Sequence, residues 1–394
     1  MKTAIWLYLF LFVAFFDLHA QYPILTPFAI SIGAAPSFIG LMMGMYSITH
    51  LPGNWIAGYS VDRYGSRLFI VFSLLLAGII LLIQSRVTDP WQLLVLRSLS
   101  GFVLAFLSPA CMALLAKLAT NQLEQGKLMA GNSLVHTLAS VVSPAAGAFL
   151  VAQIGFTTAF YILGWILIAT SLCALLFIRE QKPDPAVMQQ PLPLDHHHTT
   201  QQGEPHDVAA APPQAIPWLI YTLPVAMACA QGILSFELPL LSTTKNAMMT
   251  TGLLFSVVSL GALITLSMLF LNRLSAYYRT LWGAFMLALT YFSIAIDLPV
   301  PLAVLLFLLG MSKGVIFPAL STLLIQLSGG TRYGRTFSML SIAFSVGAFL
   351  GPMLAGQLRE HLSPYFIAFA ALMIAVSILP FHTTHPPAAQ TRLT

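Results

Sequence analysis

The sequence predicts an all-α membrane protein whose twelve transmembrane helices form two pseudo-symmetric bundles of six. Three observations support this fold class. Hydrophobic residues make up 58% of the 394 residues and charged residues only 7%, with a mean hydropathy of +0.86. A soluble domain is closer to a quarter charged. Apolar runs long enough to cross a bilayer recur along the chain, and the first half of the chain is similar to the second.

The predicted spans are apolar segments of roughly 20 residues, the length that crosses a bilayer as a helix. Many contain Gly or Pro, which membrane helices tolerate. In chain order they are Ile5 to Ala29, Pro36 to Val61, Leu68 to Ser85, Trp91 to Leu118, Leu128 to Gln153, Thr158 to Ile178, Pro217 to Leu241, Thr250 to Leu271, Thr280 to Ile296, Leu302 to Leu327, Thr336 to Leu358 and Tyr365 to Pro380.

The chain divides into four parts. Residues 1–178 hold the first six spans, residues 217–380 hold the second six, and residues 381–394 form a tail. Residues 179–216 are rich in Pro, Gln, His and acids, a composition typical of a flexible linker. Three consecutive histidines lie in this linker, and in a flexible segment they are a weak signal, so we predict no metal site.

The basic residues predict the orientation, because cytoplasmic loops are rich in Lys and Arg. With the N-terminus inside, twelve of the 17 Lys and Arg residues are cytoplasmic, while Arg86, Lys245 and Arg359 lie outside. We therefore expect a multi-pass protein of the plasma or inner cell membrane with both termini, the linker and the tail in the cytoplasm. Alternatively, "MKTAIWLYLFLFVAFFDLHAQ" is a cleaved signal peptide, which would leave eleven spans.

An internal repeat relates the two bundles. "GFVLAFLSPACMALLAKL", starting at Gly101, aligns with "GMSKGVIFPALSTLLIQL", starting at Gly310, and pairs Pro109 with Pro318. In the next span of each half, a glycine precedes a proline by eighteen residues. Two six-helix halves related in this way indicate the parallel repeat of a rocker-type transporter.

A charged turn between the second and third spans, "GYSVDRYGSR", resembles a signature of the major facilitator superfamily. Gly58, Asp62, Arg63, Gly65 and Arg67 match that signature, and the twelve spans, the linker and the repeat extend the resemblance over the whole chain. The resemblance implies a cytoplasmic gate, in which the carboxylate is attracted to the positive N-terminal end of the eleventh helix. The alternative is that these basic residues only set the topology.

Four charged residues fall at membrane depth: Asp17, Arg97, Glu237 and Lys313, with Gln21 one turn after Asp17. A charge facing lipid costs roughly 2.5 to 3.5 kcal/mol on insertion scales, so we expect these side chains to face a cavity or one another. They lie on the first, fourth, seventh and tenth spans, which by resemblance line the central cavity. We predict that Lys313 pairs with Asp17 or Glu237.

Histidines and an arginine in the spans allow two interpretations each. Arg97 with Gly101 resembles an Arg-x-x-x-Gly motif that implies proton coupling, and the alternative is a structural ion pair. His19, His50 and His136 also lie in predicted helices, where we expect structural roles.

Small residues and prolines in the fifth and eleventh spans predict helix hinges. "ASVVSPAAGA" resembles the antiporter motif of the same superfamily, although Ser143 replaces its first key glycine. Small residues let membrane helices approach closely, and proline kinks a helix. The hinge positions are Pro144, Gly147, Gly347, Gly351, Pro352 and Gly356.

Together these features predict a secondary active transporter, most simply a proton-coupled antiporter that exports a small, partly apolar solute or drug. A carboxylate in a low-dielectric cavity holds a proton more readily than one in water, so Asp17 and Glu237 would alternate between proton and substrate. The alternatives are an importer or exporter of a metabolite or lipid precursor, and a non-transporting scaffold or sensor.

No enzyme is predicted. The chain has no phosphate-binding Gly-x4-Gly-Lys-[Ser/Thr] motif. This argues against an ATP-driven pump. The expected energy source is the proton gradient, with no cofactor and no metal. The expected partners are a small-molecule substrate, protons and the lipid bilayer, without nucleic acid, and the expected state is a monomer.

Overall fold

The structure is a computed structural model that describes residues 2–118, 122–178, 218–240, 244–268, 270–271, 274–327 and 333–379. Within these ranges the regular elements are helices, and no strand occurs. In chain order they are α1 (Lys2–Ala20), α2 (Tyr22–Ser31), α3 (Pro36–Tyr64), α4 (Ser66–Gln84), α5 (Pro90–Leu104), α6 (Leu107–Leu118), α7 (Gln122–Phe177), η2 (Trp218–Tyr221), α8 (Thr222–Leu240), α9 (Lys245–Ser267), α10 (Ala276–Ala295), α11 (Leu302–Leu327), α12 (Tyr333–Leu358) and α13 (Pro364–Ile378).

Three departures from one helix per span have local causes. Gln21 separates α1 from α2, and Pro23 just beyond it has no N–H for the carbonyl four residues earlier. The break between α5 and α6 precedes Pro109 for the same reason. Conversely, α7 contains two passes that meet at Gly155, where φ is 79°, a conformation that glycine adopts without a steric penalty.

The described helices therefore make twelve passes, because α1 with α2 and α5 with α6 are single passes and α7 is two. Eight helical stretches are long and apolar enough to span a bilayer by length and composition alone. One of these, Gly131–Phe177, covers 47 residues and holds most of the two α7 passes. The predicted all-α fold with twelve spans is confirmed.

The internal repeat is visible in the packing of two aligned glycines. A Cβ at Gly101 of α5 would collide with the carbonyl oxygen of Tyr46 in α3. A Cβ at Gly310 of α11 would likewise collide with the carbonyl oxygen of Val258 in α9. Because α3 and α9 are the second pass of each half, and α5 and α11 run through the fourth, the aligned glycines make equivalent close contacts.

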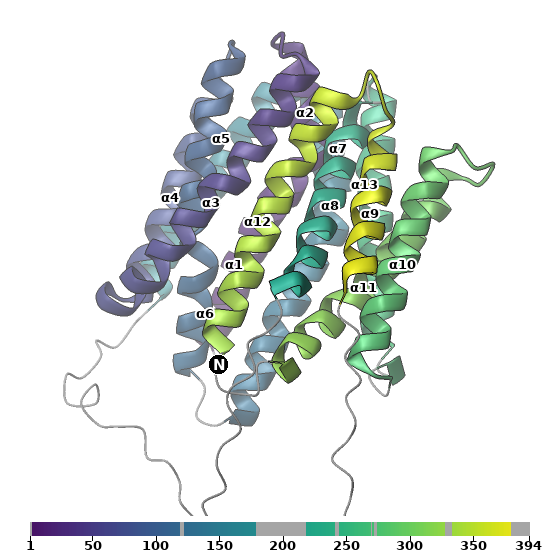
Figure 1. Cartoon of the computed structure of the whole chain (residues 1–394). Coiled ribbons are helices and arrows are strands. Elements are labelled where there is room, and N and C mark those ends of the chain that lie inside the picture. Colours follow the sequence, from purple (N-terminus) through teal and green to yellow (C-terminus); the bar gives the residue numbers. More distant parts are fainter. Residues whose placement is uncertain are drawn as a thin grey trace, which may run out of the picture.

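The bundle has two ends, which we call the linker end and the far end. The linker end carries Lys2, Gly65 and Trp218, and the far end carries Gly33 and Gly155. Figure 1 shows the labelled N-terminus at the bottom, which is the linker end. By the sequence prediction the linker end is cytoplasmic.

The two halves contact each other through α3 with α12 and through α7 with α9. The closest approaches lie in the far-end part of these helices. A Cβ at Gly40 would meet the backbone of Pro352, and a Cβ at Gly252 would lie 2.6 Å from the carbonyl oxygen of Pro144. Toward the linker end α3 and α12 diverge (Figure 1). The closest described contacts between the halves therefore lie toward the far end.

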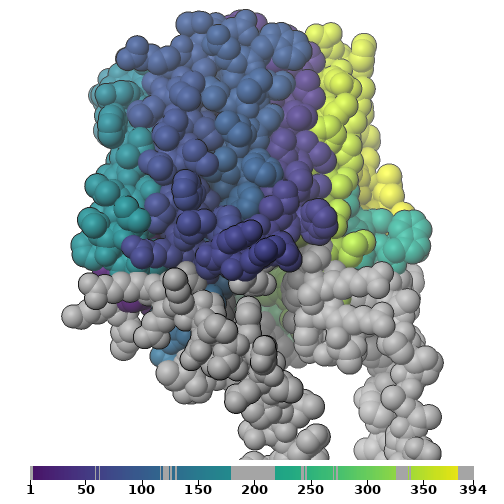
Figure 2. Space-filling model, turned by 90° about the vertical axis from the view of Figure 1, so that its left-hand side faces the viewer, coloured from purple at the N-terminus to yellow at the C-terminus, as the bar shows by residue number. Residues whose placement is uncertain are grey.

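The outer surface of the bundle is apolar in both halves. Leu176 is 64% exposed and Ile374 is 60% exposed, and Trp165 and Trp282 are each at least half exposed. Large exposed apolar areas are rare on soluble monomers, and lipid covers them in a membrane. Figure 2 shows side chains of the first half, in purple and blue, directly against α12 in yellow-green. The chain is a multi-pass membrane protein.

Candidate functional site: a cavity between the two halves

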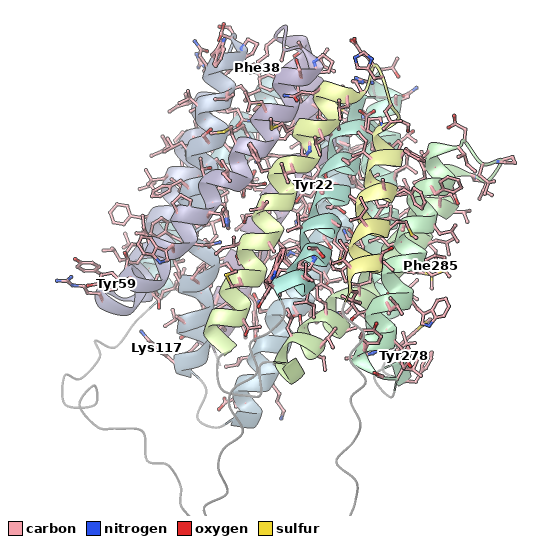
Figure 3. All side chains as sticks on the ribbon, in the orientation of Figure 1. Tyr22, Phe38, Tyr59, Lys117, Tyr278 and Phe285 are labelled. Atoms are coloured by element: carbon pink, nitrogen blue, oxygen red, sulfur yellow. The ribbon has the colours of Figure 1, made fainter. Side chains whose placement is uncertain are left out.

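A cavity of about 270 Å³ lies between the two halves. Its wall is formed by α1, α2, α3 and α5 of the first half and by α8, α11 and α12 of the second. Tyr22 of α2, which lines it, lies near the centre of the molecule (Figure 3). Most of the lining is apolar, and the polar side chains gather at a few positions: Gln21, Tyr22, Tyr46, Ser47, Arg97, Gln231, Ser235 and Lys313.

Gln21 joins Asp17 to Arg97. Its Nε2 donates to both carboxylate oxygens of Asp17 at 3.0 Å, and its Oε1 accepts from Nη1 of Arg97 at 2.7 Å. All three side chains are buried. An amide has a donor end and an acceptor end, so it bridges an anion and a cation that do not touch. The break between α1 and α2 places Gln21 at this point.

Asp17 itself lies behind the cavity wall. It borders a second hollow of about 170 Å³ between α1 and α7, whose lining includes Phe12, Leu163 and Leu167. Asp17 thus borders one hollow, while Arg97, to which Gln21 links it, lines the other.

Arg97 and Gly101 act on the same neighbour. The guanidinium of Arg97 lies 4.6 Å from the ring centroid of Tyr46, a cation–π distance, and Gly101 allows the α3 backbone at Tyr46 to approach α5. The Arg-x-x-x-Gly spacing therefore has a geometric meaning: the glycine brings α3 close enough for its tyrosine to lie against the arginine. Nε of Arg97 is buried and has no hydrogen-bond partner among the described residues.

Lys313 contacts an amide and not the predicted carboxylate. Its Nζ donates to Oε1 of Gln231 at 2.5 Å, and Nε2 of Gln231 donates to Oγ of Ser235 at 3.2 Å. Within the described ranges, no carboxylate forms an ion pair with Lys313, so the predicted pairing with Asp17 or Glu237 is wrong for this conformation. Asp17 is held by Gln21 instead.

Glu237 also lies elsewhere than predicted. It is 7% exposed, but it is not part of the cavity wall. Its Oε2 is 3.7 Å from Nη2 of Arg359, beyond the end of α12 at the far end. Oε1 is buried without a hydrogen-bond partner in the part of the chain that the structure describes. The expectation that Glu237 faces the central cavity is corrected.

Two histidines lie beside the cavity. Nδ1 of His19 is 2.7 Å from the carbonyl oxygen of Phe15, and the His19 and His136 rings are 5.2 Å apart, edge to face. Lys313 lies within electrostatic range of both rings. His50, by contrast, bonds to Asn54 within α3, in keeping with a structural role.

The charged turn at the linker end is partly described. Gly65 ends α3 and begins α4 with φ of 91°, where a side chain would be strained. Nη1 of Arg63 donates to the hydroxyl of Tyr59 at 3.1 Å, and Tyr59 lies at the edge of the molecule in Figure 3. Nη2 of Arg67 donates to the carbonyl oxygen of Leu175 in α7 at 2.5 Å.

The gate role of this turn stays a prediction. The side chain of Asp62, the surroundings of Gly58 and the residues just before α12 lie outside the described residues. The ribbons of α3 and α12 are apart at this end in Figure 1. The linker, residues 179–216, and the tail, residues 381–394, also lie outside the described part of the chain, as do residues 217 and 380 next to them.

The predicted hinge of α7 lies at close helix contacts. A Cβ on Gly147 would lie 2.6 Å from the carbonyl oxygen of Ala20, so this glycine lets α7 approach the end of α1. The backbone at Pro144 meets Gly252 of α9 in the other half. The fifth pass therefore touches both the first pass and the opposite half at the positions of its motif.

The predicted hinge of α12 is similar. Gly347 and Gly351 both face Cys229 of α8, and Gly40 of α3 lies between Pro352 and Gly356. Glycine at these positions lets α12 approach its own half and the opposite half at once. Hinge motion at Gly347, Gly351, Pro352 and Gly356 remains a prediction.

Sequence reasoning did not select Gln231, although a signal was present. A helix turns about 100° per residue, so Ser235 lies about 40° from Gln231 around α8, and Glu237 lies about 120° away on the other side. Gln231 and Ser235 thus share a polar face, which points at the cavity, while Glu237 points toward Arg359. The ionisable residue of α8, Glu237, therefore lies on a different face from the one that lines the cavity.

A mostly apolar cavity with a few polar and charged side chains, placed where two six-helix halves meet, is the arrangement of a secondary transporter. The chain belongs to the Major Facilitator Superfamily, whose family model matches residues 7–296 and, in a second match, 279–393.

Curated relatives are named as drug exporters. The chain is 24% identical over 376 residues to the "Multi-drug resistance efflux pump PmrA homolog" of Lactococcus lactis subsp. lactis (strain IL1403), covering 91% of this chain and 88% of that one. It is 25% identical over 326 residues to "Multidrug resistance protein MdtG" of Escherichia coli (strain 55989 / EAEC), covering 80% and 77%.

Solved structures share the fold. A bacterial homologue of the human lysosomal transporter Spinster, in an inward-facing and unoccupied conformation, superposes with a TM-score of 0.72 at 14% identity, covering 96% of this chain and 94% of that one. The same homologue in an inward-facing and occupied conformation gives a TM-score of 0.70 at 15% identity, covering 95% and 93%.

Proposed function

We propose that the protein exports a small, partly apolar solute in exchange for protons by alternating access. The observation that carries the proposal is the buried chain Asp17–Gln21–Arg97, which links an ionisable acid to a cation in the cavity wall. The efflux pumps among the relatives support the direction of transport. The proton gradient supplies the energy.

Gln21 couples the proton to the cavity. With Asp17 ionised, both of its oxygens accept from Nε2 of Gln21, and this holds Oε1 toward Arg97. A protonated carboxyl group has an O–H donor in place of one acceptor, so it no longer fits both contacts. Gln21 then loses its orientation, and its bond to Arg97 weakens. Proton binding at Asp17 thereby changes the charge presented to the solute without direct contact between the two.

Alternating access follows from where the halves touch. The far-end contacts at Gly40 with Pro352 and at Gly252 with Pro144 close one side, and α3 and α12 diverge toward the linker end (Figure 1). If the termini are cytoplasmic, the cavity is open to the cytoplasm, which is the side from which an exporter takes its solute. Rocking would separate the far-end contacts and close the linker end, where Asp62 would act as the latch.

The test is transport in proteoliposomes with an imposed pH gradient and a panel of candidate solutes. An acidic interior drives solute uptake by antiport, because protons leave as solute enters, whereas an importer that works by proton symport requires the reverse gradient. Asp17→Asn should abolish gradient-driven accumulation and retain solute exchange without a gradient.

Glu237→Gln is the matched control, since it neutralises the other buried acid, which is not in the cavity wall. It should keep gradient-driven accumulation. Accumulation by Asp17→Asn at the parent level would contradict the coupling role, and loss of coupling in Glu237→Gln alone would assign that role to the far-end ion pair.

A further inference from the structure

The charges around the cavity are unbalanced. Arg97 enters its wall from the first half and Lys313 from the second, and none of the described residues in the wall is acidic. In the described residues the buried acids are Asp17 and Glu237. Neither belongs to this wall, and Glu237 is paired with Arg359 toward the far end.

The two cations differ in how they are compensated. The charge of Arg97 is offset by Asp17 through Gln21. Lys313 has only the neutral amide oxygen of Gln231. An ammonium group carries three donors, and within the described ranges the structure provides one acceptor for them. The neighbouring groups from α1 and α7 are His19 and His136, which bring no negative charge.

A cation in a mostly apolar, membrane-embedded cavity is costly unless it meets an opposite charge. The described protein supplies none at Lys313, and an anionic ligand would provide the missing charge and keep the amine protonated. We propose that the solute is an amphipathic organic anion, with one carboxylate or phosphate group held by Lys313 and an apolar body in the rest of the cavity. This deepens the proposed function and rests on it, because it takes the cavity to be the transport site.

The remaining wall fits the apolar part of such a solute. Met43, Met227, Phe317 and Phe344 line the cavity, and methionines and aromatic rings adapt to flat or irregular apolar ligands. The cavity volume of about 270 Å³ is slightly below the range of about 300 to 1,000 Å³ for small-molecule sites. These dimensions suit a body of one or two rings or a short chain.

Gln231 adds a way to test the charge itself. Its Oε1 lies 2.5 Å from Nζ of Lys313, so Gln231→Glu would place a carboxylate against the ammonium group and give the protein its own counter-ion. This change leaves Lys313 in place and nearly preserves volume. It should remove the preference for anions while keeping the apolar wall intact.

The experiment measures binding to the purified full chain, without a pH gradient, by titration calorimetry. The probes share one apolar body and differ only in charge: naphthoate, naphthyl phosphate, the neutral naphthalenemethanol and the cationic naphthylmethylammonium. The parent should bind an anion about 10- to 100-fold more tightly than the neutral or cationic probe, which is about the contribution of one charge-assisted hydrogen bond. Lys313→Gln should remove this difference, and Lys313→Arg should retain most of it.

Arg86→Gln is the matched control, because it removes an exposed cation outside the cavity. It should bind all probes like the parent. If Lys313→Gln fails to fold, Gln231→Glu decides the question. Tighter binding of the cationic probe, or an anion preference that survives both Lys313→Gln and Gln231→Glu, would overturn the proposal.

A second arm separates two sources of the anion. A single-chain phosphate lipid is titrated into protein in nanodiscs, alongside the water-soluble naphthyl phosphate. Competition between the two at a Lys313-dependent site supports a lipid-derived solute, and exclusive binding of the soluble probe supports a free organic acid. Binding and coupling can fail separately: anion binding without gradient-driven flux overturns the antiport mechanism alone, and gradient-driven flux of cations without anion binding overturns this inference alone.

Discussion

The bridging role of Gln21 gives the sharpest prediction. Replacing Gln21 with methionine keeps the length of the side chain and removes both its donor and its acceptor. The carboxylate of Asp17 and the guanidinium of Arg97 would then each lose the partner that the structure shows. Both groups are buried, and only Arg97 borders the cavity, so water can replace the amide at the guanidinium more readily than at the carboxylate.

The magnitude follows from counting these contacts. The bonds to the two oxygens of Asp17 come from one amide nitrogen and are counted once, and the bond from Arg97 is counted separately. A hydrogen bond to a charged group contributes about 1.5 to 3 kcal/mol, which gives a limit of about 3 to 6 kcal/mol for the two. Direct approach of Arg97 to Asp17 would recover part of this, so we expect Gln21→Met to cost about 2 to 4 kcal/mol.

The assay is the free energy of unfolding in mixed detergent micelles, titrated with sodium dodecyl sulfate, with apparent Tm as a second readout. Gln84→Met is the matched control, since Gln84 is 1% exposed and its amide atoms have no hydrogen-bond partner among the described residues. That change should be neutral or stabilising. Equal effects of the two substitutions, or a loss below about 1 kcal/mol for Gln21→Met, would refute the bridge, because it would then contribute less than one ordinary hydrogen bond.

Other predictions concern helix contacts and the gate. Gly351→Ala drives a Cβ into the carbonyl oxygen of Cys229; because backbone cannot move aside as a side chain does, we expect a loss of about 1 to 3 kcal/mol in the same unfolding assay. Gly40→Ala pushes against the backbone of Pro352 and should favour the state open at the far end, seen as greater reactivity of cysteines engineered there; unchanged reactivity would mean that this contact does not set the balance. Asp62→Asn should weaken closure at the linker end and slow turnover, and no rise in cysteine accessibility at that end would leave the turn with a role in topology only.

The sequence predicts some of the cavity residues correctly and others incorrectly. Asp17, Arg97 and Lys313 were assigned to cavity-lining passes, and Arg97 and Lys313 do line the cavity. Glu237 lies on the predicted helix but is not part of the cavity wall; its carboxylate lies near Arg359 instead, because it is about 120° around α8 from Gln231. Gln21 was noted for its spacing from Asp17, yet its bridging role depends on the break in the first pass.

The sequence by itself determined the class of this protein: the composition, the twelve apolar segments and the repeat decide that the chain crosses a membrane in two equivalent halves. These properties are local, since the hydrophobic effect acts on each segment and a backbone in lipid must form helices. Only the tertiary structure decided that Gln21 bridges Asp17 and Arg97, that Lys313 meets Gln231, and that the halves touch at the far end. Such pairings depend on helix tilt, breaks and rotation, which place side chains from distant parts of the chain within a few ångströms of one another and leave no periodic trace in the sequence.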